Sequence, residues 1–161
     1  MNTDVITNIR QTIELLRSQQ GNIHGSQEQR WIQAHLGDER LGAVVLKLSI
    51  VAFHTLSALE TGAQTGIEIA EKINVTRGGV TRAAKKLLQY NLISAEKRPN
   101  DKKKIYYSLT ADGQTVAHVH DQMHAMIKKE LIDKLTAKYS AADLQVVASF
   151  LNDLYQLEQG F

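Results

Sequence analysis

Apolar side chains recur every three or four residues along most of the chain, and this spacing predicts amphipathic helices. In the first such segment the apolar positions are Ile6, Ile9, Ile13 and Leu16. A polar stretch with two glycines, residues 18–27, predicts a break after that helix. The predicted helices cover about residues 3–19, 27–37, 41–48, 51–59, 66–73, 77–89, 111–138 and 141–157.

Short polar motifs predict where several of these helices begin. The stretch "TGIE" (65–68) has the form of a capping box. In this motif the Thr65 hydroxyl accepts a hydrogen bond from the Glu68 backbone, and the Glu68 side chain reaches back to the Thr65 backbone. Further N-caps are predicted at Thr76, Thr110 and Ser140, and a tight turn at Asn74-Val75.

The periodicity changes after Asn91. The stretches "LISAEK" (92–97) and "KIYYSLT" (104–110) alternate as strands do, and the charged stretch "RPNDKK" (98–103) is predicted as the tip of a hairpin. One small hairpin within a helical chain predicts a mainly α fold with a β-hairpin wing, which belongs to the α+β class.

The formal net charge of +2 hides a strong local asymmetry. Residues 77–104 carry nine basic and two acidic side chains, whereas the rest of the chain carries ten basic and fifteen acidic ones. A short helix, a tight turn, a basic helix and a basic hairpin in this order predict a winged helix-turn-helix core. The concentrated positive charge favours double-stranded DNA as the partner, with the basic helix in the major groove.

The predicted DNA contacts lie on the outward face of the basic helix and on the hairpin. The helix supplies Thr76, Arg77, Gly78, Thr81, Arg82, Lys85 and Lys86, and the hairpin supplies Arg98, Asp101, Lys102, Lys103 and Lys104. Gly78 and Gly79 each cost a helix about 1 kcal/mol relative to alanine. We interpret Gly78 as allowing close approach of the backbone to DNA. The alternatives are that the glycine pair is tolerated without a function, or that it allows close packing between helices.

Asp101 is the one acid in the basic hairpin tip. We interpret its carboxylate as orienting Lys103 or Arg98 by an ion pair. The alternative is an ordinary turn aspartate that bonds the backbone two residues further on.

Residues 65–113, "TGIEIAEKINVTRGGVTRAAKKLLQYNLISAEKRPNDKKKIYYSLTADG", resemble the core of the multiple-antibiotic-resistance regulator (MarR) family. The family usually has an aspartate followed two places on by arginine at the wing tip, where this chain has Asp101 and Lys103. Lysine lacks the planar fork of arginine, so phosphate contact is the expected substitute for minor-groove insertion. The resemblance implies three segments of one intertwined domain: N-terminal dimerisation helices (1–47), the winged core (48–110) and C-terminal dimerisation helices (111–161).

The apolar stripes on residues 3–19 and 141–157 also predict a homodimer. They lie outside the winged core, which could not bury both of them. A twofold dimer predicts a pseudo-palindromic DNA site whose half-sites are about one helical turn apart. The alternative is that the stripes pack only within one chain.

His120 and His124 are spaced by four residues on the long helix, so both imidazoles lie on one face and could share a Zn²⁺ ion. A zinc-sensing branch of the MarR family resembles this chain at both positions and at His54, which precedes the "T-x-x-E" by eleven residues. That resemblance implies a fourth ligand near His35 or Glu39. The branch's second site uses a cysteine and carboxylates, and this chain has no cysteine.

The sequence predicts a homodimeric transcription regulator, most simply a repressor, that needs no cofactor and has Zn²⁺ as its candidate effector. The alternative effector is a small aromatic or amphipathic ligand near Trp31, Phe53 and Leu56, although plain core packing accounts for these residues too. A winged-helix protein-interaction module is disfavoured by the basic outward face, and no catalytic motif predicts an enzyme. The absence of cysteines and of a long apolar run predicts a cytoplasmic protein that does not enter a membrane.

Overall fold

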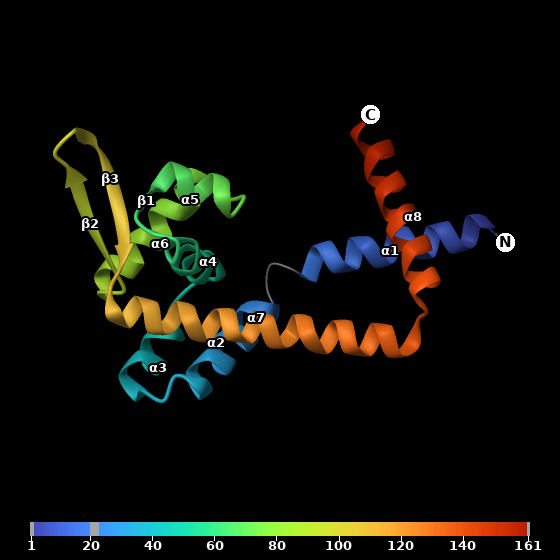
Figure 1. Cartoon of the computed structure of the whole chain (residues 1–161), viewed down its shortest axis with the longest axis horizontal. Coiled ribbons are helices and arrows are strands. Elements are labelled where there is room, and N and C mark those ends of the chain that lie inside the picture. Colours follow the sequence, from blue (N-terminus) through green and yellow to red (C-terminus); the bar gives the residue numbers. More distant parts are fainter. Residues whose placement is uncertain (1, 20–22, 161) are drawn as a thin grey trace. The chain divides into compact units, whose positions relative to one another are not determined.

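The computed structural model describes residues 2–19 and 23–160, and Figure 1 shows the order of the elements. The helices are α1 (Asn2–Gln19), α2 (Ile23–His35), α3 (Glu39–Val45), α4 (Ile50–Leu59), α5 (Gly66–Lys72), α6 (Arg77–Gln89), α7 (Ala111–Lys138) and α8 (Ala141–Gln159). The strands are β1 (Gln64–Thr65), β2 (Ile93–Arg98) and β3 (Asp101–Leu109). The predicted mainly α fold with a small wing is therefore confirmed.

Helix starts follow the predicted caps. Thr65 Oγ1 accepts from the Glu68 backbone at 3.3 Å, and the Thr65 N–H donates to the Glu68 carboxylate at 2.7 Å, which completes the capping box. Thr76 caps α6 by accepting from the Gly79 N–H at 3.1 Å. The predicted turn before it contains Asn74, whose φ of 53° is tolerated best by Asn, Asp and Gly. The predicted break over residues 18–27 lies partly outside the described residues, and α2 begins within it.

The sheet has the order β1-β3-β2 and is antiparallel throughout. Tyr107 on the central strand lies opposite Ala95 on β2 and Gln64 on β1. The predicted hairpin tip was too long, because the strands continue to Arg98 and resume at Asp101. Strand β1 was not predicted, since a two-residue strand shows no alternation.

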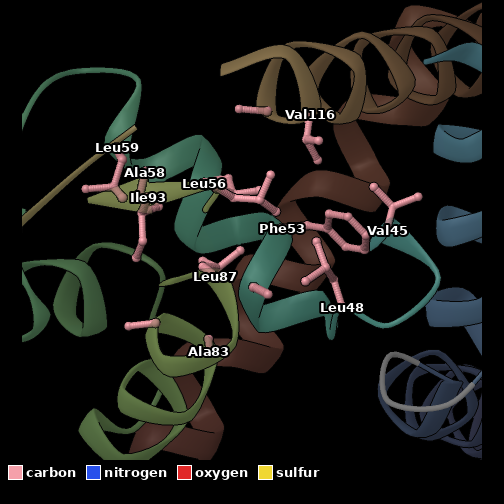
Figure 2. Packing of buried hydrophobic residues seen from close by; sticks show 14 of the residues in the cluster. Val45, Leu48, Phe53, Leu56, Ala58, Leu59, Ala83, Leu87, Ile93 and Val116 are labelled. Carbon is pink, nitrogen blue, oxygen red and sulfur yellow. The ribbon is translucent and has the colours of Figure 1, made fainter. Parts of the chain in front are cut away.

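Two units divide the chain, Met1–Met123 and His124–Phe161, and the boundary falls within the continuous helix α7. The first unit holds the hydrophobic core, to which α4, α6 and the start of α7 contribute (Figure 2). Phe53 and Leu56 of α4 and Leu87 of α6 are fully buried in it. The outward face of α6 is thus set by the core, because the helix turns its apolar side inward.

The second unit, the end of α7 and all of α8, has no buried residue on α8. Eleven of its large apolar side chains are 39–69% exposed, while Leu144, Phe150 and Leu154 are half-buried. The eleven exposed ones are Met126, Ile127, Leu131, Ile132, Leu135, Tyr139, Val146, Val147, Leu151, Tyr155 and Leu157.

No single helix among the described residues has the length and apolar character needed to cross a membrane. Helices α3 and α4 meet that test only when counted together, and they are bent by 119°.

Candidate nucleic-acid interface and metal centre

Helix α6 has two faces of opposite character. Val80, Ala83, Ala84 and Leu87 are buried against the core. Six of the seven predicted contact residues of this helix are exposed, namely Thr76, Arg77, Gly78, Thr81, Arg82 and Lys85, and the seventh, Lys86, is half-buried. The helix therefore presents basic side chains to the solvent along one face, beginning at its N-terminus.

The two glycines of α6 differ in their surroundings. A Cβ atom added to Gly78 would have only the Arg82 Nη1 atom nearby, at 3.8 Å. A Cβ atom added to Gly79 would come within 3.3 Å of the Thr76 hydroxyl that caps the helix. Gly79 thus makes room for the cap, whereas no packing within the described residues requires a glycine at position 78.

Two basic side chains of the wing are held in place by contacts with neighbouring side chains. The Arg98 guanidinium lies over the Tyr106 ring at 3.8 Å from the centroid. Asp101 forms an ion pair with Lys104 at 3.3 Å, and the hydrogen bond that the Lys104 ammonium donates to Asp101 raises the pKa of Lys104. The predicted ion-pair partner of Asp101 was Lys103 or Arg98, and the structure corrects it to Lys104. Lys102 and Lys103 are exposed.

A cavity of about 400 Å³ that the sequence does not predict lies beside α6. Three basic side chains line it: Lys47, Arg82 and Lys86. The ammonium groups of Lys47 and Lys86 both lie near the face of Tyr90, at 5.8 and 5.4 Å from the ring centroid. Lys47 was missed because it lies thirty residues before the basic segment, and folding alone brings it to α6.

Three histidines come together between α4 and α7. One nitrogen atom of each of His54, His120 and His124 lies within 4.8 Å of the others. His54 is half-buried, His120 is buried and His124 is exposed. Tetrahedral Zn²⁺ with Zn–N bonds of about 2.0–2.1 Å holds its nitrogens about 3.4 Å apart. The three imidazoles are therefore candidate ligands of one Zn²⁺ ion, and side-chain rotation would bring their nitrogens to that spacing.

His35 and Glu39 are not part of this histidine group. The His35 ring stacks on Trp31 at 3.7 Å between centroids, and its Nδ1 atom lies 2.8 Å from the Trp31 carbonyl oxygen. Glu39 is the first residue of α3. The fourth ligand inferred from the resemblance is thus not identified by the geometry of the described residues.

The His120 ring is held by neighbours from α4. Phe53 stacks on it at 5.6 Å between centroids and 11° between planes. On α7 itself, Asp121 Oδ1 lies 3.1 Å from His120 Nδ1. The Ser57 hydroxyl lies 2.9 Å from Nδ1 and 2.6 Å from Asp121 Oδ1. Neither Ser57 nor Asp121 was predicted from the sequence, because nothing in their spacing links them.

Asp121 and Glu60 share a hydrogen bond beside this group. Burial raises the pKa of the Asp121 carboxyl, but hydrogen bonds with Glu60, Ser57 and His120 outweigh burial and lower it below its usual value. The hydrogen bond with Asp121, aided by burial and by the Asp121 charge, raises the pKa of Glu60 to about 7. Asp121 is therefore the ionised member of the pair at neutral pH, and Glu60 the member that holds a proton more readily.

The short helix α5, the turn, the exposed basic helix α6 and the antiparallel wing define a winged helix-turn-helix protein of the DNA-binding class. The chain belongs to the MarR family, whose sequence pattern matches residues 48–105.

Comparison with known proteins supports this assignment. The chain is 30% identical to the uncharacterized HTH-type transcriptional regulator YvnA of Bacillus subtilis over 65% of its own length and 66% of YvnA. A crystal structure of ZitR from Lactococcus lactis, described as a zinc-responsive MarR family member, is 28% identical with a TM-score of 0.62, covering 68% of this chain and 75% of ZitR. The structure of wild-type ZitR in complex with DNA is 29% identical with a TM-score of 0.60, covering 68% of this chain and 74% of ZitR.

Proposed function

We propose that this protein is a homodimeric transcription regulator that binds a pseudo-palindromic site on double-stranded DNA and binds it more tightly when Zn²⁺ is bound. The observation that carries the DNA-binding part is the exposed basic face of α6, which begins at Arg77 and continues through Arg82 and Lys85. The basic wing extends this surface. Blocking of a promoter, and hence repression, is the simplest consequence of such binding.

Dimerisation is supported by the exposed apolar side chains of α7 and α8. A helical pair with side chains such as Leu131 and Leu151 at 56% and 44% exposure lacks an apolar partner among its own residues. A second copy of the chain offers the same surface, as a twofold interface requires. Half-sites about one helical turn apart would then face the two copies of α6.

The zinc response is supported by the histidine group and by the similarity to ZitR, a zinc-responsive MarR family member. His54 lies on α4, which packs against α6. An ion bound by His54, His120 and His124 would supply a fixed link between α4 and α7, and so would favour one spacing of the two recognition helices.

A small organic ligand is the alternative to Zn²⁺ as the effector, and it has less support. Phe53 and Leu56 are fully buried in the core, and Trp31 is covered by the His35 ring. The protein-interaction alternative is disfavoured by the exposed cations on α6.

Replacing Arg82 by alanine is expected to weaken binding to the cognate DNA site by about 1–3 kcal/mol, because arginine on this face would lose its contacts with a base edge. Fluorescence anisotropy with a duplex from upstream of the protein's own gene, at fixed salt, measures the change. Lys128→Ala on α7 is the control, since it removes an exposed cation far along the chain from α6. Equal weakening on unrelated duplexes would reduce Arg82 to a phosphate contact, and unchanged affinity would remove it from the interface.

Replacing Leu151 by aspartate is expected to shift the protein from twice the chain mass of 18.0 kDa to the single-chain mass, because a charge in an apolar interface is not solvated. Sedimentation equilibrium measures the mass, and the loss of the dimer should also weaken DNA binding. Gln145→Asp places the same charge at an exposed polar position of α8 and should leave the mass unchanged. A wild-type protein of single-chain mass at micromolar concentration would contradict the proposed dimer.

A further inference from the structure

The contacts of Ser57 and Asp121 determine which nitrogen of His120 carries the hydrogen. The Ser57 hydroxyl donates its single hydrogen to Asp121 Oδ1, 2.6 Å away. The Ser57 oxygen is then an acceptor toward His120 Nδ1 at 2.9 Å, as is Asp121 Oδ1 at 3.1 Å. Because both neighbours of Nδ1 accept, Nδ1 must be the nitrogen that donates.

We infer that Ser57 and Asp121 are positioning residues that fix His120 as the Nδ1–H tautomer and so direct the lone pair of Nε2 toward a metal ion shared with His54 and His124. The inference rests on the proposed zinc response. Imidazoles that bind metals commonly donate their second N–H to a carboxylate or another oxygen, which fixes the ring and makes it a better ligand.

Packing also restricts the orientation of the His120 ring. His120 is only 2% exposed, and Phe53 stacks on its face at an interplanar angle of 11°. Phe53 thus gives the His120 ring an aromatic support. A half-turn of the ring would keep its plane against Phe53 but would take Nδ1 away from Ser57 and Asp121.

The same residues connect the two helices that bear the ligands. Ser57 lies three residues after His54 on α4, so both side chains project from one face of that helix. Asp121 is next to His120 on α7. Hydrogen bonds from Ser57 to α7 therefore lie beside the place where the metal would join α4 to α7. Loss of this contact should weaken the metal site without removing a ligand.

Asp121→Asn tests the inference directly. The amide offers one acceptor oxygen in place of a carboxylate, and the Ser57 hydroxyl can then donate to Nδ1. Zn²⁺ affinity, measured by competition with a chromophoric chelator, is expected to fall 10–100-fold. In the metal-free protein, imidazole ¹⁵N shifts should show Nδ1–H with an unprotonated Nε2 for wild-type His120, and a rise of Nε2–H in the variant.

Two further variants keep the test decisive. Asp133→Asn makes the same change at an exposed α7 carboxylate that pairs with Lys129, and should leave both readouts unchanged. Ser57→Ala removes one acceptor and should give a smaller change in the same direction, even if Asp121→Asn fails to fold. A wild-type His120 ring with Nε2–H, or variants with wild-type zinc affinity and tautomer, would overturn the positioning role alone. A wild-type protein that binds no Zn²⁺ would overturn the zinc response together with it.

Discussion

Replacing Gly113 by alanine is expected to lower the free energy of unfolding by about 3 kcal/mol, although alanine is the better helix former by about 1 kcal/mol. Gly113 lies in the first turn of α7, where its backbone meets the chain that leaves α6. A Cβ atom at this position would overlap the carbonyl group of Leu92. That carbonyl oxygen accepts from the Thr110 N–H at 3.1 Å, so it cannot withdraw without losing a hydrogen bond.

The junction around Gly113 offers little room for adjustment. The Thr110 hydroxyl accepts from the Gly113 N–H at 3.1 Å and donates to the Asn91 carbonyl oxygen at 2.7 Å. Asn91 itself is held at a φ of 55°. Leu92 is fully buried. Alanine at position 113 must therefore shift the start of α7 away from the end of α6 and the wing.

Urea unfolding monitored by circular dichroism measures the effect, and Gly78→Ala is the matched control. Gly78 also lies in the first turn of a helix, but an added Cβ atom there meets only the Arg82 side chain at 3.8 Å. The control should raise the free energy of unfolding by up to about 1 kcal/mol. A Gly113→Ala protein as stable as wild type would mean that Leu92 and the start of α7 lie further apart than in this structure. Any loss of DNA affinity in Gly78→Ala would indicate that the backbone at Gly78 comes close to the DNA.

The comparison of these glycines shows what the amino-acid pattern could and could not predict. Helical spacing and N-cap residues placed α7 correctly, because both depend on neighbours within a few positions. They could not distinguish Gly113, which packs against Leu92, from Gly78, which touches no backbone outside its helix. The difference depends on a contact between segments twenty-one residues apart, which periodicity does not encode.

In the candidate nucleic-acid interface, too, some residues are predicted by helical periodicity and others are brought together only by packing. Arg77, Arg82 and Lys85 could be placed on one face of α6 from the period of its apolar residues. Lys47 could not, because only the packing of α4 against α6 brings it beside Arg82. In the wing, the pairing of Asp101 with Lys104 depends on how far the strands continue, and the predicted tip was too long.

Replacing His120 by alanine is expected to weaken Zn²⁺ binding by at least about 100-fold, more than second-sphere changes of 10–100-fold, because an imidazole ligand is lost outright. DNA affinity should then no longer rise with zinc. Chelator-stripped, tag-free protein is compared with and without micromolar Zn²⁺ by fluorescence anisotropy at fixed salt, since phosphate contacts make DNA affinity strongly salt-dependent. Chelator competition measures the zinc affinity in parallel.

His118→Ala is the control for the loss of an imidazole from α7. His118 is exposed and contacts Gln122 at 3.0 Å, outside the group that contains His120. It should retain both zinc affinity and the zinc effect on DNA binding. The sign of that effect decides between effectors: a bound metal that joins α4 to α7 should tighten DNA binding, whereas release of DNA is expected of an organic effector. Tight DNA binding that ignores zinc in the wild type would leave the role of α6 intact and assign the three histidines to packing alone.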